Sequence, residues 1–439
     1  MVKKPIFIIL IFLLLISIGI YAPIAHMLDK NGTVSGLNAG IVVPEPVENQ
    51  GPLRGVVNPV NSWSHGLETI YQNFLPFQIR TVATVQNAIR ALNRPFYRLY
   101  SGTVSQSCEF MGERGTNRYY KIELEMSDGT SLSFIEAVNS LTEEERSERI
   151  KSQAEAVNRL IRATDEDINI VVYATCGMEF ASFLQDYIPD EKSCAKDLEL
   201  FFSKIDPRAK TGSIQFESVF DRAERVFLTD HHWTGIGSYK GYEDIISLFR
   251  SMTEEILPAR PFGETVAVKD CMFYGSYART LALEDMWDNF SVVDYHLPRY
   301  EAEYSFDVSK YPDWSLDLSE RIRWLEERHV STMNASVYGE FYQELSPITF
   351  PDNHTGHKLL VIGDSYMQGV AELLASNFDE SYFFYWKSYK SLDYNAFIRE
   401  HGITDVLITL YGQRLVYNST NDYYLNKIHI DADDEEVSK

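Results

Sequence analysis

Lys358-Leu-Leu-Val-Ile-Gly-Asp-Ser-Tyr366 is a short apolar run that ends in Gly-Asp-Ser. Two other runs, Ile168–Ala174 and Asp405–Leu410, have a similar length and the same continuous apolar character. Such runs are typical of strands that are buried on both faces of a parallel sheet. Helical patterns lie between them, so the sequence predicts a doubly wound α/β sandwich with a mostly parallel sheet.

The segments around these strands carry helix and hairpin signals. Leu141-Thr142-Glu-Glu-Glu145 has the pattern of a capping box and predicts a helix that runs to about Ala163. Lys121–Met126 and Ser131–Phe134 flank Asp128-Gly129, a dipeptide typical of hairpin turns, and predict a small β-hairpin insertion. Further helices are expected at residues 67–99, 192–204, 239–257, 367–376 and 395–401.

The first residues indicate the compartment. Lys3 and Lys4 precede an uncharged, mostly apolar run from Pro5 to about Ile24, which is long enough to span a bilayer. The basic flank should stay in the cytoplasm, so the rest of the chain lies outside it. A cleaved signal peptide is the alternative, and it also gives an extracytoplasmic protein. We expect a transmembrane signal anchor at 1–26, a linker at 27–62, the main domain at 63–430 and an acidic tail at 431–439.

Net charge and cysteine content limit which partners, metals and disulfides are expected. The 439-residue chain has a formal charge of −23 and a pI near 4.9. An acidic surface repels nucleic acids, so we expect no nucleic-acid partner. The four cysteines show neither CxxC nor a Cys/His zinc spacing, which argues against a structural metal. Outside the cytoplasm they form up to two disulfides or stay as free buried thiols; they are Cys108, Cys176, Cys194 and Cys271.

The Gly363-Asp364-Ser365-Tyr366 motif stands where a buried strand turns into a helix. A serine at that point has its hydroxyl at the carboxyl end of the sheet. The adjacent helix N-terminus offers unpaired N–H groups that can stabilise an oxyanion. Taken alone, the motif more often indicates a helix cap than a functional serine.

The second motif is Thr229-Asp230-His231-His232-Trp233-Thr234. In an extended segment Asp230 and His232 point to the same side, and the carboxylate can then hold the imidazole as a general base for a serine. We expect His231 to point away and Trp233 to pack against the site. A metal cluster and a core-facing His-His-Trp are the alternatives, with His354 and His357 as the candidate extra ligands. We expect no metal and no other cofactor.

The two motifs in this order, Asp-His-His-Trp and then strand–Gly-Asp-Ser-Tyr–helix, resemble the DHHW protein family. That family is similar to the AlgJ/AlgX-type polysaccharide O-acetyltransferases of the SGNH (GDSL-like) hydrolase superfamily. Asn73-Phe-Leu-Pro-Phe77 and Phe273-Tyr-Gly-Ser-Tyr-Ala278 also resemble segments of these proteins. The resemblance covers roughly residues 65 to 420 and is strongest at the two motifs.

The resemblance implies an SGNH-like three-layer α/β/α sandwich in which Ser365 is the nucleophile, His232 the base and Asp230 the residue that orients the base. The backbone N–H of Ser365 is the expected oxyanion donor, and Gly275 or Ser276 is the candidate for a second one. Tyr366 and Trp233 are expected to support the site. Gln413 stands where relatives tend to carry Glu-Arg, so its role is open.

The same resemblance implies acetyl transfer through an acetyl-serine to a cell-surface or secreted polysaccharide. The acetyl donor would come from a multi-pass partner of the membrane-bound O-acyltransferase type. Two alternatives stay open: an acetyl esterase of the same fold, because water can replace the sugar hydroxyl, and a non-catalytic glycan-binding assembly protein. The residues do not identify the polysaccharide.

Overall fold

The described part of the chain lies within one compact unit, Val82–Lys439. The computed structural model describes residues 108–114, 117–125, 129, 131–139, 141–175, 187–188, 195–281, 283, 285–303, 322, 342–385, 391–412, 415 and 428–430. Among these residues no helix is both long enough and apolar enough to cross a membrane. The expected anchor, the expected helices at 67–99 and the acidic tail lie outside them.

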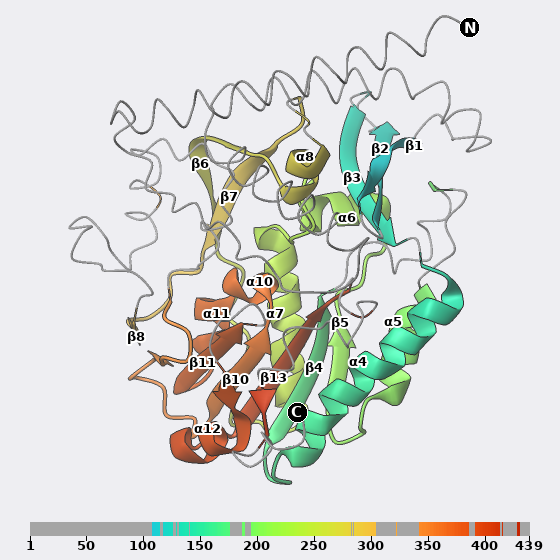
Figure 1. The fold of residues 1–439 in the computed structure, drawn as a ribbon. Helices are drawn as coiled ribbons and strands as arrows, with labels where there is room; N and C mark the ends of the chain where they lie inside the picture. The colour runs from blue at the N-terminus through green and yellow to red at the C-terminus, as the bar shows by residue number, and fades with distance from the viewer. Residues whose placement is uncertain are drawn as a thin grey trace, which may run out of the picture. The chain divides into compact units, whose positions relative to one another are not determined.

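A seven-stranded sheet forms the centre of this unit (Figure 1). Its first five strands are parallel, and the last two add antiparallel pairs at one edge. The three apolar runs of the sequence are its neighbouring central strands, as predicted. In spatial order the strands are β5 (Lys210–Ser213), β4 (Asn169–Thr175), β13 (Asp405–Tyr411), β10 (Lys358–Gly363), β11 (Glu380–Tyr385), β9 (Ile348–Thr349) and β8 (Glu301–Ala302).

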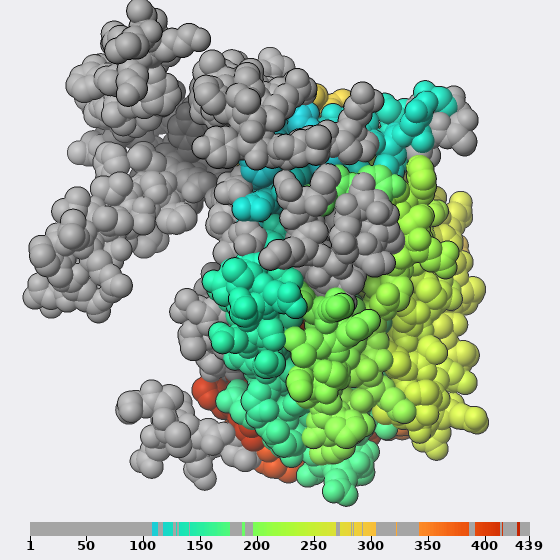
Figure 2. All heavy atoms as spheres, turned by 90° about the vertical axis from the view of Figure 1, so that its right-hand side faces the viewer, coloured from blue at the N-terminus to red at the C-terminus, as the bar shows by residue number. Residues whose placement is uncertain are grey.

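Helices cover both faces of this sheet. The chain leaves the centre in opposite directions from β4 to β5 and from β10 to β11, and right-handed crossovers then put the connecting helices on opposite faces. Helices α4 and α5 pack together on one face (Figures 1 and 2), and α7 and α11 pack together on the other. Their bounds are α4 (Glu143–Ala163), α5 (Ala195–Lys204), α7 (Gly235–Arg250) and α11 (Ala371–Ala375).

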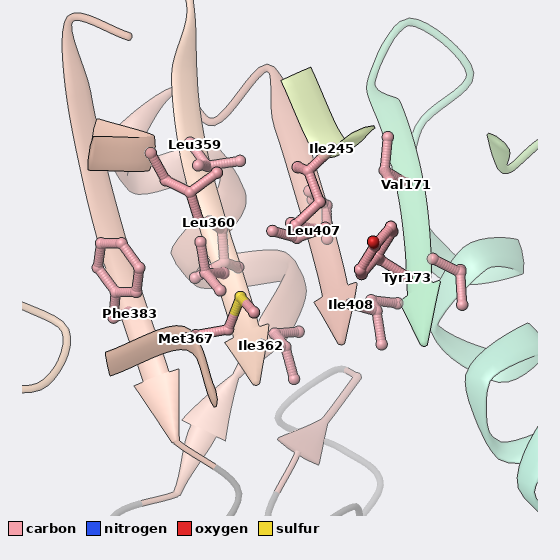
Figure 3. Packing of buried hydrophobic residues seen from close by; sticks show 14 of the residues in the cluster. Val171, Tyr173, Ile245, Leu359, Leu360, Ile362, Met367, Phe383, Leu407 and Ile408 are labelled. Atoms are coloured by element: carbon pink, nitrogen blue, oxygen red, sulfur yellow. The ribbon is translucent and has the colours of Figure 1, made fainter. Parts of the chain in front are cut away.

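The core between the layers is built from the strands' own side chains. Leu360, Ile362 and Leu407 are fully buried and belong to one apolar cluster with Ile245 of α7 and Met367 (Figure 3). Burying an aliphatic side chain of this size contributes about 1.5–3 kcal/mol. Because β4, β10 and β13 are buried at nearly every position, the core extends over both faces of the sheet.

Several local predictions are confirmed. The capping box of α4 is present, with Thr142 and Glu145 bonding each other's backbone N–H groups. The predicted hairpin is β2 (Asn117–Glu125) and β3 (Ser131–Asn139), which β1 (Cys108–Arg114) extends to a three-stranded sheet. The helix at 395–401 is α12 (Tyr394–His401).

Two helices differ from the prediction. The helix expected at 239–257 is α7, which begins at Gly235 after its N-cap Thr234 and ends at Arg250. The expected helix at 367–376 consists of two short pieces, α10 (Ser365–Gln368) and α11, because the chain leaves the helical conformation at Val370, between the C-cap of α10 and the start of α11. The remaining elements are α6 (Val219–Arg225), β6 (Glu264–Phe273), α8 (Ser276–Leu281), β7 (Asp288–Asp294), β12 (Leu392–Asp393) and β14 (Ile428–His429).

The cysteine alternatives are settled only for Cys108. It is a free, buried thiol in β1, and burial together with the charge of Glu109 raises its pKa to about 12. The side chains of the other three cysteines lie outside the described part of the structure.

A hydrogen-bonded Asp–His pair links the amino ends of β10 and β13. His357, just before β10, holds Asp405 at the start of β13 with an Nδ1–Oδ2 distance of 2.6 Å. Asp405 is fully buried and also accepts a hydrogen bond from Asn169 of β4. The hydrogen bond from His357 to the Asp405 carboxylate raises the pKa of His357, against the opposing effect of burial.

We predict that His357→Asn lowers the free energy of unfolding by about 2 kcal/mol in mild acid, because it removes a charge-assisted hydrogen bond. The folded-state pKa is raised, so this contribution is complete below the unfolded pKa of about 6.5 and is lost as the pH rises through the folded value. Urea unfolding of both proteins between about pH 6 and pH 9 measures it. A difference that does not shrink with rising pH would contradict the assignment.

Candidate active site

Ser365 lies at the carboxyl end of the central sheet. It is the first residue of α10, directly after β10, and Asp364 is the N-cap. The Asp364 carboxylate accepts hydrogen bonds from the N–H of Tyr366 at 3.1 Å and from the N–H of Tyr411 at 2.8 Å. Because Tyr411 ends β13, Asp364 joins the ends of two adjacent strands and fixes where the serine stands.

Asp230 and His232 meet in a tight bend. The segment is closed by an antiparallel bridge between Val226 and Trp233. Asp230 Oδ1 accepts the backbone N–H of His232 at 2.9 Å and lies 2.6 Å from His232 Nδ1. The expected extended conformation was therefore wrong: a side-chain-to-backbone turn of the aspartate brings the two side chains together.

These residues form a continuous hydrogen-bonded chain with the serine. His232 Nε2 lies 2.6 Å from Ser365 Oγ. If Nδ1 carries the proton toward Asp230, Nε2 is the acceptor that faces the hydroxyl. Asp230 is 2% exposed, and although burial raises its pKa, the charges of His231 and His232 and the hydrogen bonds from His232 and Ser276 hold the pKa well below its usual range. A charged Asp230 can stabilise an imidazolium at His232.

His231 does not point away as expected. Its Nδ1 lies 2.8 Å from Ser276 Oγ and 3.2 Å from Asp230 Oδ1, and its ring centroid is 4.1 Å from that of His232. Its contact with Ser276 holds His231 inward, beside the bend that joins Asp230 to His232. Its side chain stays 24% exposed, so it forms part of the surface beside the base.

Trp233 and Tyr366 pack behind the base. Trp233 is 1% exposed and donates its indole N–H to the carbonyl of Tyr366 at 3.2 Å. The Tyr366 hydroxyl donates to the carbonyl of His231, and its ring centroid lies 4.9 Å from that of His232. These contacts cross from the Asp-His-His-Trp bend to α10 and hold the base against the serine.

The Gly275-Ser276 segment supports Asp230. Gly275 N–H donates to Thr229 Oγ1 at 2.9 Å, and Ser276 N–H donates to Asp230 Oδ2. Both N–H groups are therefore bonded within the protein and support the Asp230 loop, and the role of either as a second oxyanion donor stays a prediction. Ser365 remains the candidate donor, because the N–H groups of Tyr366 and Met367 both bond to Asp364. Gln413 lies outside the described residues.

The metal alternative loses its proposed extra ligands. His357 is bonded to Asp405 and Glu255 at the amino end of β10, the end opposite to Ser365, and His354 is exposed in the loop before it. Asp230, His231 and His232 have ligand atoms within 4.8 Å of one another. Those atoms already bond to each other and to Ser276, which accounts for their proximity.

Sequence reasoning missed Tyr411. Its ring stacks on Tyr366 with centroids 5.1 Å apart, and it lies 5.1 Å from His231. It is the last residue of β13, and the carboxyl ends of parallel strands share one edge of the sheet. The strand pattern therefore contained the signal that would have identified it.

Neither a protein-family profile nor a curated protein matches the sequence. Among solved structures, a DHHW family protein from Eubacterium siraeum is 17% identical over 72% of this chain and 97% of its own, with a TM-score of 0.49. Bacillus cereus PatB1 with a sulfonyl adduct is 15% identical over 68% of this chain and 97% of its own, also with a TM-score of 0.49.

The O-acetyltransferase domain of Pseudomonas putida AlgJ is 12% identical over 70% of this chain and 98% of its own, with a TM-score of 0.35. The neighbours thus include the DHHW and AlgJ proteins that the two motifs resemble. At these identities and scores the similarity supports no conclusion about activity.

We predict that Gly275→Ala destabilises the protein by more than about 2 kcal/mol, because overpacking at a rigid site costs about this much. A Cβ there would lie 2.2 Å from the carbonyl oxygen of Thr229 and 2.5 Å from Asp230 Cβ. Gly212→Ala is the control, since its Cβ would meet the flexible end of Leu248 at 2.8 Å. Thermal and urea unfolding measure both; equal losses would contradict the close packing of Gly275 on the Asp230 loop.

Proposed function

We propose that this protein is an extracytoplasmic O-acetyltransferase that moves an acetyl group through an acetyl-serine to hydroxyls of a cell-surface or secreted polysaccharide. The observation that carries the proposal is the chain Asp230–His232–Ser365, with distances of 2.6 Å at both links. A serine hydroxyl, an imidazole and a buried carboxylate in this order are the parts of a nucleophilic acyl-transfer site.

In the first step Ser365 Oγ attacks the acetyl carbonyl of the donor, and the Oγ proton moves to His232 Nε2. The oxyanion that forms accepts a hydrogen bond from the backbone N–H of Ser365. The donor's leaving oxygen or sulfur then takes the proton from His232 as its bond to the acetyl carbon breaks. The products are acetyl-Ser365 and the protonated leaving group.

In the second step a sugar hydroxyl attacks the acetyl carbon and gives its proton to His232. The bond to Ser365 Oγ breaks, and the serine takes the proton back from His232. Asp230 stays ionised throughout, in line with its depressed pKa, and stabilises the transient imidazolium. The product is the acetylated sugar, and the site returns to its starting state.

The wider arrangement of the proposal follows from the resemblance and the first residues of the sequence. The SGNH-like domain would be tethered outside the cytoplasm by the segment at residues 1–26. A multi-pass partner of the membrane-bound O-acyltransferase type would deliver the acetyl group across the membrane. A membrane tether keeps the two proteins close enough for the transfer to occur before hydrolysis of the donor.

We predict that Ser365→Ala abolishes acetylation of the cell-surface polysaccharide while leaving the protein folded. Ser365 is half-buried, its hydroxyl bonds to His232, and α10 is capped by Asp364, so loss of the hydroxyl should cost little stability. Complementation of a deletion strain, followed by measurement of ester-linked acetate on the isolated polymer, tests this. Unchanged acetylation with a correctly folded variant would remove both enzymatic interpretations and leave the non-catalytic one.

The transferase and the esterase differ in the acceptor. With a soluble acetyl ester and an oligosaccharide, we expect the full-length protein to yield acetylated oligosaccharide, detected by mass spectrometry, and an acetyl group on the peptide that contains Ser365. His232→Ala should eliminate both signals, because the serine loses its base. Release of acetate without acetylated oligosaccharide, together with deacetylation of the native polymer, would favour the esterase.

A further inference from the structure

The loop Phe227–Asp230 carries the aspartate of the site but belongs to no strand of the central sheet. Its backbone bonds to elements outside that sheet. The Leu228 carbonyl accepts the N–H of Ile135 from β3 at 2.8 Å. The Thr229 carbonyl accepts the N–H of Tyr277 from α8 at 3.0 Å. The position of Asp230 therefore depends on segments that come from other parts of the chain.

Asp288, the first residue of β7, binds this loop with three hydrogen bonds. Its carboxylate accepts the N–H of Leu228 at 2.7 Å, the N–H of Thr229 at 3.0 Å and the hydroxyl of Thr229 at 2.6 Å. The residue is 6% exposed, and burial raises its pKa although these hydrogen bonds oppose the shift. A buried carboxylate that receives three donors from two adjacent residues fixes their orientation.

The Thr229 hydroxyl links Asp288 to the Gly275-Ser276 segment beside Asp230. It donates to Asp288 Oδ2 and accepts the N–H of Gly275 at 2.9 Å. The next residue, Ser276, donates its N–H to Asp230 Oδ2. One hydroxyl thus joins the β7 carboxylate to the segment that holds the catalytic aspartate.

A buried ion pair, Arg222–Glu136, also contacts this loop. The Arg222 guanidinium bonds to Glu136 at 3.1 Å and donates to the carbonyl of Phe227 at 2.9 Å. It lies over the ring of Phe134, 4.5 Å from its centroid, and its charge lowers the pKa of Asp288 in opposition to burial. The loop is therefore anchored by charged groups from β3, α6 and β7.

We infer that Thr229 and Asp288 are positioning residues of the site: together they hold Asp230, and through it the imidazole of His232, at the distance that activates Ser365. This inference rests on the proposed acyl-transfer chemistry only for its kinetic consequence. The geometric consequence, a fixed hydrogen bond between Asp230 and His232 Nδ1, is independent of any substrate.

Thr229→Val and Thr229→Ser form the matched test in the full-length protein. Valine keeps the shape but loses the hydroxyl, whereas serine keeps the hydroxyl. The first readout is the low-field proton resonance of the His232 Nδ1–H, assigned by its loss in Asp230→Asn. The second is the rate at which phenylmethanesulfonyl fluoride labels Ser365, followed by mass spectrometry.

We expect Thr229→Val to shift or broaden the low-field resonance and to slow the labelling at least about tenfold, because small displacements of a catalytic group cost up to a hundredfold. Thr229→Ser should stay within about twofold of the wild type. A folded Thr229→Val with wild-type resonance and labelling would overturn the inference. If Thr229→Val does not fold, Asp288→Asn, which keeps an acceptor oxygen, replaces it. The same change in the resonance and the same slower labelling are then expected, and wild-type behaviour of a folded Asp288→Asn would overturn the inference.

The two proposals fail in different ways. A wild-type protein that shows the resonance but never reacts at Ser365 would count against the proposed function and leave the positioning role testable by the resonance alone. Normal labelling of the wild type together with an unaffected Thr229→Val would count only against the positioning role.

Discussion

The candidate site depends on the need to keep the buried Asp230 carboxylate charged. A carboxylate without partners in a protein interior takes up a proton, because desolvation penalises the ionised form. Here the carboxylate receives the N–H of Ser276, the N–H of His232 and the ring of His232. Each donor comes from a defined direction, so satisfying the charge also determines the orientation of the imidazole.

This requirement explains why the site needs more than the central sheet. The sheet supplies Ser365, because Asp364 fixes the turn after β10 by bonding to the N–H of Tyr411 at the end of β13. It supplies none of the donors to Asp230. The N–H and the ring of His232 come from the loop before α7, and the N–H of Ser276 comes from the segment that leads into α8. Asp288 of the β6–β7 hairpin holds the loop before α7 through the N–H of Thr229. The sheet therefore positions the serine, and the elements outside the sheet position the Asp230–His232 pair that faces it.

The contrast between sheet and loop also decides what the sequence could predict. The central strands were predictable because their apolar runs are local, and the capping box of α4 was predictable because both partners lie within three residues. Asp230, His232 and Ser365 could be chosen because their residue types and spacing specify chemistry. The inward turn of His231 could not be predicted, because it depends on Ser276, which is 45 residues away.

The hydrogen bonds of Gly275 and Ser276 could not be predicted from the sequence for a related reason. Sequence proximity to a motif indicates that a segment lies near a site, but it does not say which N–H groups remain unpaired there. That depends on where the loop before it runs, and here Thr229 and Asp230 occupy both donors. Assigning oxyanion donors requires every hydrogen bond of the segment, whereas assigning a nucleophile requires only its position at a strand end.

Two Asp–His pairs, Asp230–His232 and Asp405–His357, lie at opposite ends of the central sheet. They differ in the group that bonds to the outer nitrogen, Nε2, of the histidine. Both have Nδ1–carboxylate distances of 2.6 Å. In one, Nε2 of His357 faces the carboxylate of Glu255 at 3.3 Å, a partner that favours a protonated ring and hence a structural ion pair. In the other, Nε2 of His232 faces the hydroxyl of Ser365, which can donate a proton to it. The chemistry of each pair is therefore set by the partner of its outer nitrogen, and of these two pairs only that of His232 has a hydroxyl as the partner of Nε2.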